Sequence, residues 1–193
     1  MFSGDIDQDC WLLFNFLEPL NYYTGSERKR NQFKGALCKK NGGSVLYGYT
    51  WKGFLKYNED GTKLLRKKSK YKGLYETKIK ELYPELEDIF KEFGQIHFPN
   101  FPWVNVQINK DYITPPHYDS SNVGESVIVA LGDYTEGELC VDRKSYIEEI
   151  NIRHKPYQFN GSIYKHWVKP HKSGCRISVV FFNSKCLKDK IKI

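Results

Sequence analysis

The spacing of hydrophobic residues changes near residue 100, from the three- and four-residue intervals of helices to the alternation of strands. Between Glu76 and Phe93 the apolar residues keep the helical interval, so we expect an amphipathic helix that ends at Gly94. The apolar stripe consists of Ile79, Leu82, Leu86, Ile89 and Phe93. Pro84 lies within it and predicts a kink, or two short helices with the proline in the first turn of the second. Core packing accounts for this stripe.

From Val104 onward, apolar and polar residues alternate. Val104, Val106 and Ile108 are interleaved with Asn105, Gln107 and Asn109. Two further segments, residues 126–131 (SVIVAL) and 176–182 (RISVVFF), are short and rich in β-branched or aromatic residues. Turn sequences occur between them at Gly132-Asp133, Glu136-Gly137, Asn160-Gly161 and Ser173-Gly174. The pattern predicts several short strands in the second half of the chain.

Helices followed by strands predict an α+β, mainly β fold, in which an antiparallel sandwich or barrel is buttressed by N-terminal helices. Asp5 or Asp7 can cap a first helix that runs through Trp11, Leu12 and Phe16. The chain has 193 residues and no linker rich in proline and glycine, so we expect one domain over residues 1–193. Residues 1–100 are expected to form a mixed, basic support, and residues 101–186 the core that carries the chemistry.

Composition excludes several classes of protein. Hydrophobic residues make up 40% and aromatic residues 16% of the chain, which disfavours global disorder. The apolar runs are far shorter than the roughly 20 residues that span a bilayer, so no membrane association is expected. Acidic residues precede the first apolar stretch, unlike a secretion signal, and the 5 cysteines include no C-x-x-C pair. We expect an intracellular protein, cytoplasmic or nuclear, and its oligomeric state is not predicted, although a monomer is compatible with the sequence.

The chain is basic, with 30 Lys and Arg against 23 Asp and Glu and a formal net charge of +7. One basic cluster contains Arg28, Lys29, Arg30, Lys34, Lys39 and Lys40, and a denser one contains Lys63, Arg66, Lys67, Lys68, Lys70 and Lys72. Such a field attracts polyanions such as nucleic acid. A solvated face or a nuclear-import patch is the alternative interpretation.

Three residues are candidate metal ligands. His117 and Asp119 are two positions apart, so in an extended chain both side chains point to the same face. This is the spacing of a facial site of two histidines and one carboxylate, which leaves coordination positions open on Fe(II). His166, in the strand-like sequence SIYKHWVKP, is the expected third ligand. A His-x-Asp pair alone also arises by chance, and His166 alone could instead be a satisfied strand histidine. His154, in a charged stretch, and His171, after a proline, are rival ligands that suit the surface better.

Arg176 and Ser178 form a candidate anion clamp. They open the last predicted strand and lie on one of its faces, while Ile177 and Val179 lie on the other. A guanidinium with a neighbouring hydroxyl can hold a carboxylate end-on through charge-assisted hydrogen bonds. Arg176 could alternatively pair with a structural carboxylate.

Together, H-x-D, then H, then R-x-S resemble the Fe(II)- and 2-oxoglutarate-dependent dioxygenases over about residues 105–183. The resemblance implies a double-stranded β-helix, or jelly-roll barrel. It also implies that His117, Asp119 and His166 bind Fe(II), that Arg176 and Ser178 bind the distal carboxylate of 2-oxoglutarate, and that O2 is consumed. The strand NVQIN is similar to the family's co-substrate strand, so Asn105, Gln107 or Asn109 is expected to contact 2-oxoglutarate.

The segment HYDSSNVGESVIVALGDYTEGEL resembles the TET/JBP branch of nucleic-acid pyrimidine oxidases more closely. Asn122 stands where an asparagine of the methylcytosine enzymes contacts the flipped target base; a turn residue before Gly124 is the alternative. The chain lacks the cysteine-rich zinc region of those enzymes. In GDYTEGEL, Gly137 and the acidic residues are interpreted as a hairpin turn of the barrel.

Three functions are therefore compared. The first is a dioxygenase that hydroxylates the 5-methyl group of 5-methylcytosine or thymine in nucleic acid, with DNA favoured over RNA as the partner. The second is a protein prolyl or lysyl hydroxylase, or a small-molecule hydroxylase, of the same superfamily. The third is a nucleic-acid-binding barrel without turnover, against which the complete ligand set argues.

Overall fold

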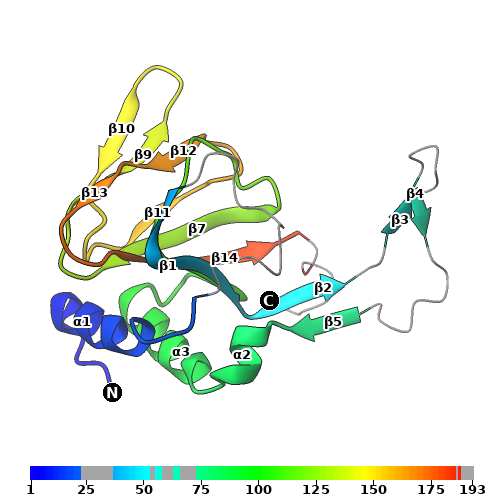
Figure 1. The fold of residues 1–193 in the computed structure, drawn as a ribbon, viewed down its shortest axis with the longest axis horizontal. Coiled ribbons are helices and arrows are strands. Elements are labelled where there is room, and N and C mark those ends of the chain that lie inside the picture. Colours follow the sequence, from blue (N-terminus) through cyan, green and yellow to red (C-terminus); the bar gives the residue numbers. More distant parts are fainter. Residues whose placement is uncertain (23–36, 53–54, 58–62, 66–72, 186, 188–193) are drawn as a thin grey trace.

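The protein is described from a computed structural model, which covers residues 1–22, 37–52, 55–57, 63–65, 73–185 and 187 (Figure 1). The two basic clusters fall largely outside this description. Residues 28–34 and 66–72 are not described, and for Lys39, Lys40 and Lys63 only the backbone is. The nucleic-acid role expected of these clusters therefore stays a prediction.

Three helices lie in the described part of the first half of the chain. Helix α1 spans Ile6–Leu17, α2 spans Lys78–Leu82 and α3 spans Leu86–His97. The side chain of Asp5 caps α1 by accepting a hydrogen bond from the backbone N–H of Gln8 at 2.9 Å, as the sequence allowed. The prediction of two helices around Pro84 is confirmed, although this proline precedes α3 instead of lying in its first turn.

Gly94 does not end α3, so that prediction was wrong; the helix continues to His97. A Cβ on Gly94 would lie 3.0 Å from Nε1 of Trp103 and 3.1 Å from Cε2 of Phe98. The glycine is therefore a place where two aromatic rings pack closely on the helix, and not a helix terminus.

The strands form antiparallel sheets. The largest has five strands in the order β1 (Leu37–Tyr47), β6 (Asn105–Ile113), β14 (Ile177–Ser184), β7 (Asn122–Leu131) and β11 (Tyr157–Phe159). A three-stranded sheet has the order β10 (Ile147–Ile150), β9 (Leu139–Asp142) and β12 (His166–Val168). Two-stranded ladders join β13 (His171–Lys172) to β8 (Thr135–Glu136), β2 (Tyr49–Lys52) to β5 (Gly73–Glu76), and β3 (Leu55–Tyr57) to β4 (Lys63–Leu65).

The five-stranded sheet separates two apolar cores. On one face, fully buried side chains such as Val106 of β6 and Phe181 of β14 pack on Phe90 and Phe93 of α3. On the other face, Ile128 and Ala130 of β7 belong to a second cluster with Leu139 and Val141 of β9. Figure 1 shows the helices against one side of the large sheet and strands β9, β10 and β12 across the other.

The mainly β, antiparallel architecture with a few N-terminal helices is thus confirmed. Among the described strands the hydrogen bonds form separate sheets and not one closed barrel. The longest described helices have 12 residues, and none combines the length and the hydropathy needed to cross a bilayer.

Candidate metal centre and anion clamp

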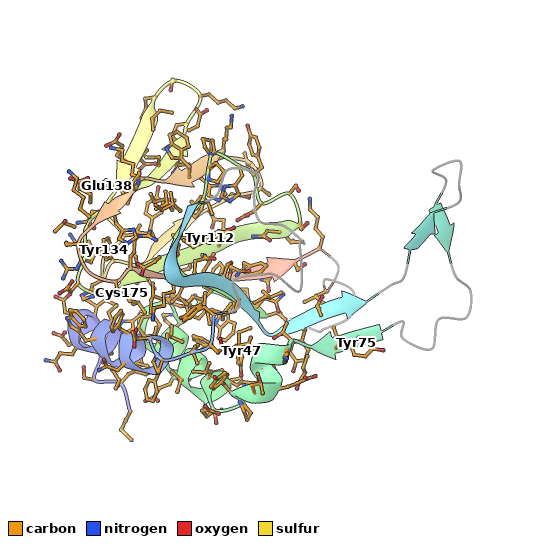
Figure 2. The ribbon with its side chains drawn as sticks, in the orientation of Figure 1. Tyr47, Tyr75, Tyr112, Tyr134, Glu138 and Cys175 are labelled. Carbon is orange, nitrogen blue, oxygen red and sulfur yellow. The ribbon has the colours of Figure 1, made fainter. Side chains whose placement is uncertain are left out.

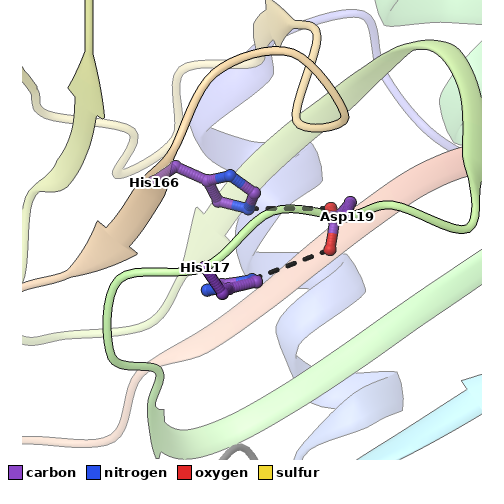
Figure 3. A group of neighbouring side chains, drawn as sticks. All are labelled: His117, Asp119 and His166. Carbon is purple, nitrogen blue, oxygen red and sulfur yellow. Dashed lines mark ion pairs between the residues drawn. The ribbon is translucent and has the colours of Figure 1, made fainter.

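Three potential ligand side chains converge where the segment between β6 and β7 meets the start of β12. His117 and Asp119 lie in the segment between β6 and β7, and His166 begins β12. Nε2 of His117 is 3.6 Å from Oδ1 of Asp119, and Nε2 of His166 is 3.6 Å from Oδ2 of the same carboxylate (Figure 3). The ligand atoms of all three residues lie within 4.8 Å of one another. In the part of the chain that the structure describes, this is the one such group of His, Cys, Asp and Glu.

Backbone hydrogen bonds hold this group together. His117 and His166 form an antiparallel bridge, in which each backbone N–H donates to the other's carbonyl at 2.9 Å. The backbone N–H of Asp119 donates to the carbonyl of Gly161, also at 2.9 Å. Two segments almost fifty residues apart in sequence are therefore joined directly at the candidate ligands.

The hydrogen bonds of the two imidazoles determine which ring nitrogen carries the proton. Nδ1 of His117 is 2.8 Å from the carbonyl oxygen of Pro115, and Nδ1 of His166 is 3.1 Å from that of Tyr164. A carbonyl oxygen only accepts, so each Nδ1 must carry the proton and donate. In the neutral rings the lone pair of Nε2 then faces Asp119. Two lone pairs and a carboxylate directed at one point repel one another unless a cation lies among them.

Electrostatics favour the metal-binding form of His166. Burial lowers the pKa of His166, the charge of Asp119 opposes that shift, and His117 adds to it. The ring is therefore mainly neutral near pH 7, which is the form that binds a metal. Gly161 borders the same point, because a Cβ there would lie 3.0 Å from both Oδ2 of Asp119 and Cε1 of His166. A residue without a side chain keeps this space open.

Arg176 lies just before β14 with only 1% of its surface exposed. Neither Nε nor Nη2 of its guanidinium has a hydrogen-bond partner among the described residues. Burial lowers the pKa of Arg176, and Tyr134 opposes the shift through its charge interaction and a side-chain hydrogen bond. The guanidinium carbon lies 5.4 Å from the Tyr134 ring centroid. A buried cation with two unused donors is costly unless an anion joins it, so the residues fit a bound carboxylate.

Ser178 continues the polar face that begins at Arg176. Ser44 of β1, Asn109 of β6 and Ser178 of β14 are direct cross-strand neighbours. Ser44 donates from Oγ to Oδ1 of Asn109 at 2.6 Å, which leaves the amide Nδ2 of Asn109 facing Oγ of Ser178 at 3.5 Å. Gln107 points to the same side and donates to Oγ of Ser44 at 2.9 Å. These hydroxyl and amide groups form a polar row across three strands.

The two remaining candidates have other contacts. Asn105 is 2% exposed, and its Oδ1 accepts the backbone N–H of Tyr49 at 2.7 Å. This hydrogen bond lies beside Gly48, where φ is +123°, so the side-chain oxygen of Asn105 stabilises the turn between β1 and β2. Asn122 is 8% exposed and donates from Nδ2 to Oδ2 of Asp119 at 3.3 Å. Asn122 therefore orients the candidate carboxylate ligand. Neither of the two roles considered from the sequence, a contact to the target base or a turn residue, includes this hydrogen bond.

The expectation that His154 and His171 lie on the surface was wrong, since they are 6% and 7% exposed. Each is buried beside a carboxylate from a distant segment: His154 Nδ1 is 2.9 Å from Asp7, and His171 Nε2 is 2.9 Å from Asp111. Their charged or loop-like sequence context did not reveal these partners. Both lie outside the group of three candidate ligands.

Sequence reasoning missed three residues at the site. Tyr134, beside Arg176, lies in the segment that was interpreted only as a hairpin turn; it is labelled in Figure 2, near Cys175 in that view. Ser44 belongs to the first half of the chain, which was interpreted as support. Gly161 had been noted only as a turn residue. No signal in the sequence pointed to any of the three, because Tyr134 meets Arg176, Ser44 meets Asn109 and Gly161 meets Asp119 only through tertiary contacts.

Comparisons with known proteins give the following. No family model matches the chain, and no curated protein matches it. Among solved structures, NgTET1 in complex with 5mC DNA is 17% identical with a TM-score of 0.47, over 74% of this chain and 61% of that one. An oxidoreductase of the 2OG-Fe(II) oxygenase family from Burkholderia pseudomallei is 20% identical with a TM-score of 0.41, over 58% of this chain and 60% of that one.

A Pseudomonas putida prolyl-4-hydroxylase is 10% identical with a TM-score of 0.46, over 94% of this chain and 88% of that one. The chain therefore spans less than two thirds of the length of the first two structures. At these identities and TM-scores the similarities carry no argument about function, which must come from the site.

Proposed function

We propose that this protein is an Fe(II)- and 2-oxoglutarate-dependent dioxygenase built on a double-stranded β-helix. The observation that carries the proposal is the pairing of two features. Three ligand atoms of His117, Asp119 and His166 lie within 4.8 Å of one another, and a buried guanidinium with unused donors opens a strand of the large sheet. A metal site alone fits many proteins, whereas a buried anion clamp in addition fits a carboxylate co-substrate.

The two histidines and the aspartate would hold the metal. This donor set suits Fe(II), because two imidazoles and one carboxylate on one face of the metal leave coordination positions open for other groups. Fe(II), 2-oxoglutarate and O2, when bound, supply the chemistry that inserts one oxygen atom into a C–H bond. The carbonyls of Pro115 and Tyr164 keep both rings in the tautomer that presents Nε2.

The clamp residues would bind the distal carboxylate of 2-oxoglutarate. The unused Nε and Nη2 of Arg176 can donate two parallel hydrogen bonds to one carboxylate, and Oγ of Ser178 can donate a third. Asn109, held by Ser44, is oriented with its amide hydrogens toward Ser178. Burial strengthens these bonds because little water competes for the carboxylate.

For the substrate, we propose the 5-methyl group of a pyrimidine, 5-methylcytosine or thymine, in nucleic acid, with DNA favoured. The support is the similarity of residues 117–139 to the TET/JBP oxidases and the net charge of +7. A base in a duplex must leave the stack to reach the metal, at a cost of a few kcal/mol. We propose that Asn122, besides its hydrogen bond to Asp119, also contacts that base.

The enzyme class is tested by succinate formation from 2-oxoglutarate with Fe(II) and O2, and by calorimetric binding of Mn(II). The wild-type chain should bind the metal and form succinate, whereas His117→Ala and Asp119→Ala should lose both. Asp88→Ala, which removes an exposed carboxylate in the first turn of α3, is the matched control and should behave as wild type. A chain that binds nucleic acid but forms no succinate would instead be the non-catalytic barrel.

The substrate is tested by mass spectrometry of nucleosides after incubation with DNA that contains 5-methylcytosine or thymine. A base heavier by one oxygen atom is the expected product. Succinate formation with unchanged nucleosides would contradict the substrate proposal and favour a prolyl, lysyl or small-molecule hydroxylase. Replacement of the lysines and arginine within residues 63–72 should weaken DNA binding and its salt dependence while succinate formation persists.

A further inference from the structure

A buried aspartate and a buried histidine are hydrogen-bonded to each other, and the aspartate also to the backbone of Arg176 in the proposed clamp. Asp111, at the far end of β6, is 9% exposed, and His171, on β13, is 7% exposed. Nε2 of His171 lies 2.9 Å from Oδ1 of Asp111. The same oxygen accepts the backbone N–H of Arg176, also at 2.9 Å. Three separate segments of the chain therefore meet at one carboxylate oxygen.

Asp111 and Arg176 hold each other through the backbone as well. The backbone N–H of Asp111 donates to the carbonyl of Arg176 at 2.8 Å, in return for the bond that Asp111 accepts. Asp111 has a φ of +47°, an uncommon conformation for a residue other than glycine. Lys110 is the last β6 residue paired with β14, through Ile177, so Asp111 continues the contact one step beyond the ladder. The backbone of Arg176 is thus fixed at the point where its side chain turns inward.

The negative charge of Asp111 acts on the Arg176 guanidinium, but Asp111 does not pair with its unused donors. The negative charge of Asp111 acts to raise the pKa of Arg176, against the larger effect of burial. Its Oδ1 is bonded to the backbone N–H of Arg176 and to His171, while Nε and Nη2 of Arg176 have no partner within the described segments. An acid that paired directly with the guanidinium would compete with any incoming carboxylate. This acid does not.

Gly137 and Tyr134 pack closely on both His171 and Arg176. Gly137, with a φ of +81°, is so close that a Cβ on it would lie 2.9 Å from Cβ of His171 and 3.3 Å from Cδ and Nε of Arg176. The Tyr134 ring lies 6.0 Å from the His171 ring, with their planes nearly perpendicular. His171 and Arg176 are therefore packed between the same glycine and the same tyrosine.

We propose that Asp111 and His171 are positioning residues for the carboxylate clamp, which hold the Arg176 backbone and leave its guanidinium open to the distal carboxylate of 2-oxoglutarate. This inference rests on the proposed function. His171 acts through Asp111, because its N–H directs the carboxylate toward the backbone of Arg176. The hydrogen bonds described above join Asp111 and His171 to each other and Asp111 to the backbone of Arg176.

The test is calorimetric titration of the full-length Mn(II)-loaded chain with 2-oxoglutarate, since Mn(II) permits binding without turnover. Asp111→Ala should raise the Kd for 2-oxoglutarate about tenfold, the effect expected when a hydrogen bond to a charged group is lost. Asp111→Asn should stay within about threefold of wild type, because asparagine tolerates positive φ and its amide oxygen still accepts. Mn(II) affinity should not change in either variant. Asp88→Asn, on the surface of α3, is the control.

A merely structural role predicts a different result: a lower melting temperature in Asp111→Ala with an unchanged Kd, which would overturn the inference. If Asp111→Ala does not fold, His171→Phe decides, because it keeps an aromatic ring against Tyr134 and removes the N–H. It should raise the Kd about threefold, less than the loss of Asp111 because His171 acts only through that carboxylate, and an unchanged Kd would overturn the inference. A wild-type chain that binds Mn(II) but not 2-oxoglutarate would overturn the proposed function itself.

Discussion

The two faces of strand β14 differ in what they bury. Toward the helices, Ile177, Val179 and Phe181 have no exposed surface and belong to the larger apolar core. On the opposite face, Arg176 directly before the strand and Ser178 within it are both polar and both buried. The same eight-residue strand thus contributes to a hydrocarbon core on one side and to a charged site on the other.

This difference reflects two separate tasks. Apolar side chains on the helix face gain free energy by leaving water, so they stabilise the fold. A buried guanidinium with unused donors does the opposite until a ligand arrives. The contrast predicts that substitutions on the helix face change stability, whereas those on the site face change ligand binding, sometimes with a gain in stability.

The largest change in stability is expected from Phe181→Ala. The Phe181 ring lies 4.8 Å from the centroid of Phe98 and 5.1 Å from that of Trp103, with no exposed surface. Its removal leaves a cavity and should lower the free energy of unfolding by about 3–5 kcal/mol. Urea denaturation followed by tryptophan fluorescence measures this. A loss below about 1 kcal/mol would mean that this face is not the main source of stability.

Arg176→Met should separate stability from binding. Methionine fills similar space without a charge, so the free energy of unfolding should rise by roughly 1–3 kcal/mol. Affinity for 2-oxoglutarate should fall about a hundredfold, because the charge-assisted hydrogen bonds are lost. Thermal denaturation and calorimetry measure the two effects. A variant that is both less stable and equally able to bind would contradict the assignment of Arg176 as a clamp.

Gly161→Ala tests whether space at the metal site matters as much as the ligands. The added methyl group would lie 3.0 Å from Oδ2 of Asp119 and from Cε1 of His166, so Mn(II) affinity should fall about tenfold. Gly73→Ala is the matched control, since among the described side chains its Cβ would meet only Cε2 of Tyr75, at 3.7 Å. Equal metal affinity in both variants would show that the site adapts to the extra carbon.

The smallest effect concerns the helix layer. Burial acts to raise the pKa of Asp9, but hydrogen bonds from Ser3, Gly4 and His97 together outweigh it and lower the pKa below its ordinary value of 3.8. A lowered carboxyl pKa adds stability above the unfolded value, and this stability is lost as pH falls through the folded value.

Asp9→Asn should therefore cost about 1 kcal/mol at pH 7, and the difference from wild type should shrink below about pH 4. Urea midpoints at pH 7 and pH 3 measure this. A constant difference at both pH values would show that the charge of Asp9 contributes nothing to stability.

The residues of the candidate centre could be predicted because their chemistry is local. His117 and Asp119 share a face through their spacing alone, and Arg176 and Ser178 do so on the last predicted strand. The apolar alternation of β6 and β14 likewise follows from composition at each position. These features depend on residues a few positions apart.

The rest depends on contacts between distant segments. Ser44 is 65 residues from Asn109 in sequence, and His171 is 60 residues from Asp111, yet both pairs are hydrogen-bonded. Gly94 follows the usual pattern of a helix end, but its packing against Trp103 explains why the helix continues. Neighbouring residues do not encode such contacts.

The amino-acid sequence was enough to predict a mixed, partly helical first half, a β-rich second half, and the candidate ligand types in their order along the chain. Periodicity and side-chain chemistry act over short distances, which is why they can be read without coordinates. Folding settled which nitrogen of each histidine is turned toward Asp119, that Nε and Nη2 of Arg176 have no hydrogen-bond partner among the described residues, and that Asp111 accepts the backbone N–H of Arg176. Those properties arise only when strands pair across large sequence separations, because burial and hydrogen-bond geometry belong to the assembled sheets.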